Sequence, residues 1–128
     1  MRNPFAPATL CLSALLAACE SPGISDDFPD IYAVSADQTV QVTNMGGRPV
    51  HYMIHERVDA GLIFWGKCTP ANEGCPVLAP GERLRIPYAE LGGYDPGDTE
   101  AIIYWWESRI DGNGGYRVVG DDQAIVRL

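Results

Sequence analysis

The sequence predicts an all-β fold, an antiparallel β-sandwich of about seven to eight short strands, and three observations support this fold class. Short runs that alternate apolar and polar side chains follow one another from residue 39 to the end of the chain. Glycine, proline, asparagine and aspartate separate these runs, as they do in turns between strands. No window keeps apolar residues at helical spacing for three turns. We therefore expect one sandwich domain over residues 31–128.

The expected strands follow the chain in order. Residues 39–43 and 50–57 should form a hairpin around a turn at 44–47, where asparagine and glycine permit positive φ. Residues 62–65 form the next expected strand and lead directly to Cys68. The remaining elements are expected strands at 83–86, 99–107, 116–119 and 123–128, a helical turn within 88–94, and turns at 79–82, 95–98, 111–115 and 120–122.

The run at 99–107 is apolar on both of its faces. One face carries Ala101, Ile103 and Trp105, and the other carries Ile102, Tyr104 and Trp106. In a two-layer protein, an apolar outer face must be covered by the chain's own cysteine loop or by something outside the chain. The second possibility gives a candidate binding surface made of Trp65, Ile103 and Trp105.

The N-terminal residues have the pattern of an export signal. Arg2 precedes an apolar run over 6–18 that ends in small residues, and this run is too short to span a membrane. Leu16, Ala17, Ala18 and Cys19 resemble the lipobox of bacterial lipoproteins. The resemblance implies cleavage before Cys19 and attachment of fatty acids to its sulfur. It divides the chain into a signal peptide (1–18), a flexible acidic tether (19–30) and the sandwich domain (31–128).

A lipid on Cys19 would hold the protein in the bacterial cell envelope, because two or three acyl chains anchor a protein almost permanently. Glu20 stands where enteric lipoproteins of the inner membrane carry aspartate, and this resemblance favours the periplasmic side of the outer membrane. Loss of residues 1–18 leaves eight basic and seventeen acidic residues, a net charge of about −9. That charge argues against binding to nucleic acid, which requires clustered Lys and Arg.

The four cysteines divide into two groups. Cys11 leaves with the leader and Cys19 takes the lipid, so that Cys68 and Cys75 remain together in an oxidising compartment. We expect a disulfide between them, worth on the order of 2 to 3 kcal/mol by loop entropy. The alternative, a zinc site, would need a shorter spacing and a second pair of ligands.

Two stretches resemble the immunoglobulin-like domains of bacterial envelope proteins, of which the intracellular proteinase-inhibitor type is one example. The first is the valine-rich run from Val40 to Gly47, followed by Pro49 and Val50. The second is the proline–glycine–glutamate turn between Leu78 and Glu82. The resemblance implies an immunoglobulin-like sandwich, and it supports a fold rather than an activity.

One alternative function is copper binding. His51, Met53 and His55 lie on one face of one expected strand, about 7 Å apart in succession, and copper prefers imidazole and thioether ligands. The competing interpretation is that these are solvent-facing residues of an edge strand. A calcium loop at Asp111, Asn113 and Asp122 lacks the spacing of the known motif, and a glycine-rich hairpin explains these residues.

The sequence contains no recognisable nucleophile motif and no phosphate-binding loop. We therefore expect a non-enzymatic module without a cofactor, which binds an envelope protein or pads an assembly. A further alternative is a proteinase inhibitor, in which the loop from Thr69 to Gly74 enters a protease cleft as a preorganised strand.

Overall fold

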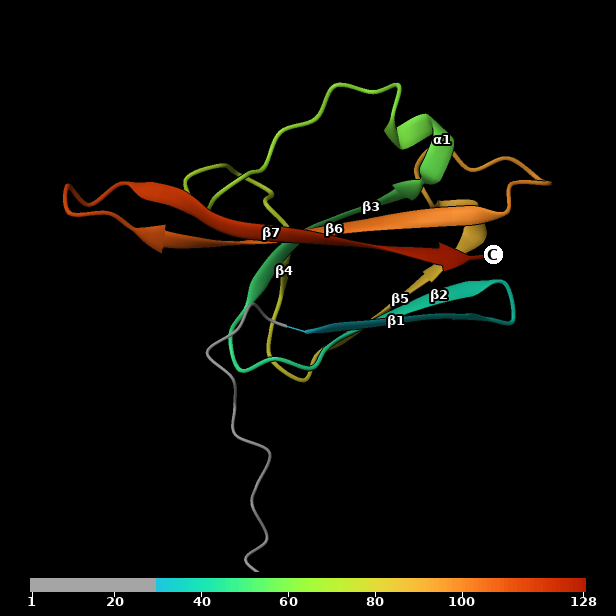
Figure 1. Cartoon of the computed structure of the whole chain (residues 1–128), viewed down its shortest axis with the longest axis horizontal. Coiled ribbons are helices and arrows are strands. Elements are labelled where there is room, and N and C mark those ends of the chain that lie inside the picture. Colours follow the sequence, from blue (N-terminus) through green and yellow to red (C-terminus); the bar gives the residue numbers. More distant parts are fainter. Residues whose placement is uncertain (1–29) are drawn as a thin grey trace, which may run out of the picture.

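A computed structural model describes residues 30–128, and the predicted leader, lipobox and most of the tether lie outside these residues. The described chain forms seven strands in two antiparallel sheets that pack face to face (Figure 1). The predicted antiparallel β-sandwich is therefore confirmed. In the described part of the chain, no helix is long and apolar enough to cross a membrane.

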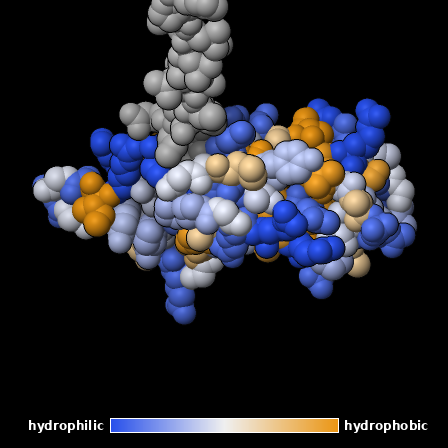
Figure 2. All heavy atoms as spheres, turned by 90° about the horizontal axis from the view of Figure 1, so that it is seen from below, coloured by the Kyte–Doolittle hydropathy of each residue, from blue (hydrophilic) through white to orange (hydrophobic). Residues whose placement is uncertain are grey.

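The first sheet, sheet A, contains β1 (Ile31–Ala36), β2 (Thr39–Asn44) and β5 (Arg83–Pro87) in the order β1-β2-β5. β1 was not among the expected strands. It joins β2 through Asp37 and Gln38, which both adopt positive φ, as a two-residue hairpin turn requires. Seen from the side of sheet A, hydrophilic side chains dominate the surface (Figure 2).

The second sheet, sheet B, contains β3 (Val50–Glu56), β4 (Val77–Leu78), β6 (Glu100–Ile110) and β7 (Tyr116–Arg127) in the order β4-β3-β6-β7. A helical turn, α1 (Arg57–Ala60), follows β3, and a 3₁₀ turn, η1 (Tyr88–Glu90), lies in the predicted place after β5. The chain changes sheet between β2 and β3, between β4 and β5, and between β5 and β6. These crossings between two sheets give the immunoglobulin-like arrangement.

Three sequence-based expectations about strands are wrong. Residues 39–43 and 50–57 do not pair as a hairpin, because β2 and β3 belong to different sheets. Residues 62–65 form an irregular segment instead of a strand. Residues 120–122 do not turn the chain. They lie within β7 beside a β-bulge, where Trp106 is opposite Asp121 but Ser108 is opposite Val118.

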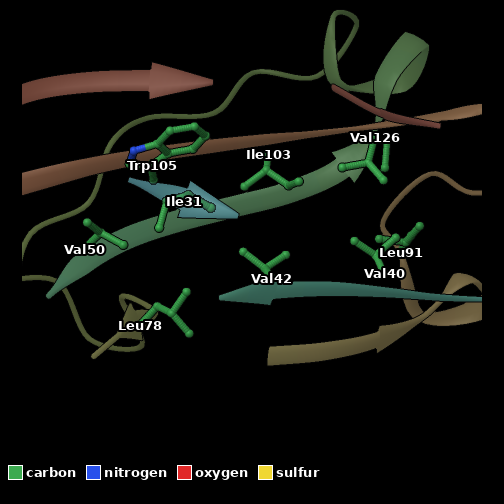
Figure 3. Close-up of a cluster of buried hydrophobic side chains, with 10 residues drawn as sticks. Ile31, Val40, Val42, Val50, Leu78, Leu91, Ile103, Trp105 and Val126 are labelled. Atoms are coloured by element: carbon green, nitrogen blue, oxygen red, sulfur yellow. The ribbon is translucent and has the colours of Figure 1, made fainter. Parts of the chain in front are cut away.

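The core lies between the sheets, and strand alternation decides which residues reach it. From sheet A come Val40 and Val42, and from sheet B come Val50, Ile103 and the other inward-facing residues. Figure 3 shows these side chains gathered between β2 and the strands of sheet B. The resulting two-layer body supports loops on the outer face of sheet B, where the candidate sites lie.

Candidate functional site

The outer face of sheet B is covered by the chain itself. The segment from residue 61 to residue 76, which we call the covering loop, runs from α1 to β4 across this face (Figure 1). Trp65 lies against the ring of Tyr104 with a centroid distance of 4.6 Å and against Trp106 at 6.0 Å. The indole N–H of Trp106 donates a hydrogen bond of 2.7 Å to the carbonyl oxygen of Cys68. The doubly apolar strand therefore has its cover, and it comes from the cysteine loop.

The expected disulfide joins Cys68 to Cys75 within the covering loop, and this prediction is confirmed. The tip between the cysteines is exposed and forms a turn in which the Asn72 amide donates to the Thr69 carbonyl at 2.8 Å. The side chain of Asn72 accepts from the Thr69 amide at 2.9 Å and fixes the same turn. A turn of this kind differs from the extended strand that the proteinase-inhibitor alternative assumes.

The candidate binding surface made of Trp65, Ile103 and Trp105 is wrong for two of its three residues. Ile103 is 0% exposed and Trp105 is 5% exposed, because both point into the core between the sheets. Trp65 is half-buried over Tyr104. The inward face of β6 belongs to the core and the covering loop lies on its outward face, so neither face is open to a partner.

His51, Met53 and His55 lie on the outer face of β3, opposite the outward residues of β6. The strand separates the two imidazoles by about 13 Å along its length. Each imidazole has partners of its own: His51 reaches the Ser108 hydroxyl at 2.8 Å, and His55 reaches the Asp59 carboxylate at 2.5 Å. Within residues 30–128, no group of three or more His, Cys, Asp or Glu could hold a metal ion. The structure thus does not bring the predicted copper ligands together.

His55 and Asp59 form a histidine–carboxylate pair that joins β3 to α1. Gly92 lies against the ring, since a Cβ atom at this position would come within 2.3 Å of the His55 Nδ1 atom. Gly93 packs in the same way on Asp59. Backbone, rather than a nucleophilic side chain, therefore covers the imidazole on this side. The pair holds α1 and the glycine segment together.

Exposed apolar side chains lie within and directly after α1. Val58, Leu62, Ile63 and Phe64, which we call the apolar segment, are exposed, with Leu62 at 79% and Phe64 at 103%. The backbone is nevertheless held in place. The Glu56 carboxylate caps α1 by accepting from two of its amides, and the amides of Leu62 and Ile63 donate to the Asp59 carbonyl at 2.8 and 3.1 Å. Val58, Leu62 and Ile63 thus lie on a hydrogen-bonded turn, and Phe64 follows it directly.

Sequence reasoning placed residues 62–65 in a strand and so missed the apolar segment. The available signal was a run of consecutive apolar residues with no polar alternation, directly after Gly61. A half-buried strand alternates, and an exposed apolar run is unfavourable unless it has a function.

A second protrusion is the hairpin of β6 and β7 beyond the bulge, which extends past the rest of the sandwich (Figure 1). Ile110, Tyr116 and Val118 are exposed there. Arg109 and Arg117 are paired directly across the two strands. This hairpin thus carries exposed apolar side chains on different strands from those that hold the apolar segment.

A shallow hollow of about 440 Å³ lies at the start of sheet A. It is bordered by Asp30, the first described residue, and by Tyr32, Met45 and Arg83 among others. Arg83 donates to the Thr43 hydroxyl at 3.4 Å. The hollow contains no buried polar group that would orient a ligand.

The chain was also compared with known proteins. No family model, curated protein or solved structure matches it. Its function must therefore be inferred from its own residues and their geometry.

Proposed function

We propose that this protein is a lipid-anchored protein of the bacterial cell envelope whose sandwich domain binds a partner protein, without catalysis, through the apolar segment at Val58, Leu62, Ile63 and Phe64. The observation that carries the binding role is the exposure of these side chains on a hydrogen-bonded turn and at the residue that directly follows it. Large apolar side chains that stand together in water mark interaction sites. Because the backbone is already ordered, binding would cost little conformational entropy.

The anchor is supported by the sequence Leu16-Ala17-Ala18-Cys19 and by the disulfide. Disulfides persist in oxidising compartments such as the periplasm, and an exported domain would reach one. The resemblance at the lipobox further implies that the tether at 19–30 connects the lipid to β1.

A protein groove suits the apolar segment better than a lipid surface does. Segments that insert at a membrane interface carry Lys and Arg around their apolar residues. Here Glu56 and Asp59 lie in the supporting turn, and Arg57 is paired with Glu100. Burial of one such side chain is worth about 1.5 to 3 kcal/mol, so Leu62 and Phe64 together could supply the central contacts of an interface.

Site-specific photo-crosslinking tests this proposal in the anchored, full-length protein. A photoreactive phenylalanine at position 64 should give a discrete protein adduct, and the same probe at Ile110, an apolar position that is 66% exposed, should not. In affinity capture from detergent-solubilised envelope, the pair of substitutions Leu62→Ser and Phe64→Ser should abolish retention of that protein, whereas Ile110→Ser should preserve it.

Two results would contradict the proposal. Crosslinking of position 64 to lipid alone would make the segment a membrane contact. Retention of the same protein by the doubly substituted chain would show that the segment does not bind it. Folding is not expected to confound the comparison. Substitutions at exposed positions usually change the free energy of unfolding by less than about 0.5 kcal/mol.

A further inference from the structure

The disulfide lies directly against a buried histidine. His51 is 6% exposed, and its Nδ1 atom is 3.3 Å from the sulfur of Cys75. The same nitrogen is 3.1 Å from the carbonyl oxygen of Pro76, and Nε2 is 2.8 Å from the Ser108 hydroxyl. Both cysteine residues are partly exposed, whereas His51 is buried.

The hydrogen-bond partners assign the position of the imidazole proton. A carbonyl oxygen only accepts, so the Pro76 carbonyl requires a proton on Nδ1. Nε2 is then the acceptor, and the Ser108 hydroxyl donates to it. The imidazole proton therefore sits on Nδ1, the nitrogen that lies 3.3 Å from the Cys75 sulfur.

The protonated imidazole fits this site equally well. A hydroxyl both donates and accepts, so Ser108 would accept a hydrogen bond from a protonated Nε2, and Nδ1–H would keep its partners. Of the charged groups next to Ser108, Glu107 pairs with Arg48 and Arg109. Lys67 pairs with Asp121, and Glu73 is exposed at the loop tip. His51 thus contacts the Cys75 sulfur, and all of its hydrogen-bond partners can accommodate a second proton on the imidazole.

We propose that Cys68–Cys75 is a thiol–disulfide exchange site at which His51 stabilises the departing Cys75 thiolate, and that its reaction partner is a dithiol. This activity goes beyond the proposed binding function and does not depend on the lipid anchor. A thiolate stabilised by a neighbouring imidazolium is the better leaving group in such an exchange.

The exchange takes place in two steps. A thiolate of the dithiol attacks the Cys68 sulfur and forms a mixed disulfide. The bond to Cys75 breaks, and its electron pair remains on the Cys75 sulfur opposite Nδ1–H. The second thiol of the reductant loses its proton and attacks the reductant's sulfur in the mixed disulfide, which releases the Cys68 thiolate. In total the dithiol is oxidised, and the two cysteines gain two electrons and two protons.

The geometry should survive reduction because each cysteine is attached to the sheet independently of the disulfide. Cys75 precedes Pro76 and β4, whose Val77 pairs with His51. The carbonyl of Cys68 accepts the indole hydrogen bond of Trp106. Reduction would therefore open only the exposed tip at 69–74.

The first test is the direction of attack. The full-length protein is incubated with glutathione, and the mixed disulfides are mapped by mass spectrometry after cleavage at Glu73, which separates Cys68 from Cys75. The adduct should form on Cys68 at least about tenfold more often than on Cys75. His51→Gln should remove this preference, and His55→Gln, the same change four residues along the same strand face, should leave it intact.

The second test measures the rate of reduction by dithiothreitol. His51→Gln should slow reduction about fivefold or more, and His55→Gln should leave the rate unchanged. An even distribution of glutathione in the unchanged protein would overturn the proposal. The proposal would also be overturned if His51→Gln kept both the preference of glutathione for Cys68 and the reduction rate of the unchanged protein.

A third measurement needs no substitution and remains valid if the His51 variant does not fold. After reduction, an ordinary thiol is alkylated by iodoacetamide roughly 200-fold more slowly at pH 6 than at pH 9, because few thiols are ionised at pH 6. For Cys75 this ratio should shrink at least about tenfold, while Cys68 keeps the ordinary ratio. Equal ratios at the two cysteines would overturn the proposal.

Discussion

Replacing Asn44 with alanine should destabilise the sandwich more than any other single loss of a polar side chain. Asn44 ends β2 in sheet A and is completely buried. Its side-chain amide donates to the carbonyl of Leu78 in sheet B at 3.0 Å and to the carbonyl of Arg48 at 2.7 Å. Its side-chain oxygen accepts from the amide of Gly46 at 2.9 Å. One side chain of sheet A thus bonds both to the connection between β2 and β3 and to sheet B.

The expected loss follows from these three bonds. Each intramolecular hydrogen bond contributes about 1 kcal/mol, and a buried carbonyl left without a partner costs about 1 to 3 kcal/mol. Asn44→Ala should therefore lower the free energy of unfolding by about 3 to 4 kcal/mol, a large part of the roughly 5 to 15 kcal/mol of a typical domain. Asn44→Asp should be at least as unfavourable, because a carboxylate cannot donate to the Leu78 and Arg48 carbonyls.

Urea unfolding followed by tryptophan fluorescence measures this loss. With a denaturant dependence of roughly 1.5 kcal/mol per molar, the midpoint should fall by about 2 M. The matched control is Asn72→Ala, which removes an asparagine whose side chain also accepts a backbone hydrogen bond, but in an exposed loop. A loss below about 1 kcal/mol in Asn44→Ala, or an equal loss in the control, would refute this account of the crossing.

Three further predictions concern stability. Gly92→Ala places a Cβ atom 2.3 Å from the His55 ring and should cost about 1 to 3 kcal/mol in urea unfolding, whereas Gly112→Ala, in open space, should be nearly neutral. Burial, and then the charge of Glu82, raises the pKa of Tyr52 above its ordinary value of 10.0. The unfolded chain therefore loses this proton first as pH rises. The contribution of Tyr52 to stability should be constant below about pH 10 and fall above it, and Tyr52→Phe should weaken that alkaline loss in pH-dependent unfolding. Reduction of the disulfide should lower the free energy of unfolding, measured in urea, by about 2.5 kcal/mol.

The sequence was most informative where alternation was strong. At 99–107 it predicted two apolar faces and the need for a cover, and both follow from the period of two residues in a strand. It left open whether the cover belonged to the chain, because contacts between distant loops carry no local pattern. For the same reason Ile103 and Trp105 were placed on a surface, although sheet A covers them.

The errors have physical causes too. Two valine-rich runs joined by an asparagine–glycine turn have the local pattern of a hairpin, but the buried side chain of Asn44 directs the second run into the other sheet. The apolar run at 62–65 has the composition of a strand, yet α1 and its hydrogen-bonded turn leave no neighbouring strand with which it could pair. Gly120, Asp121 and Asp122 are residue types common in turns, but Gly120 adopts its positive φ at a bulge within β7.

Intact-mass spectrometry of the protein purified from bacterial envelope tests the central claim, that lipid on Cys19 anchors the sandwich domain to a membrane. The account predicts a chain that begins at Cys19 and carries a mass increment of at least two acyl chains. A chain that retains residues 1–18, or one in which Cys19 is an unmodified thiol, would contradict it.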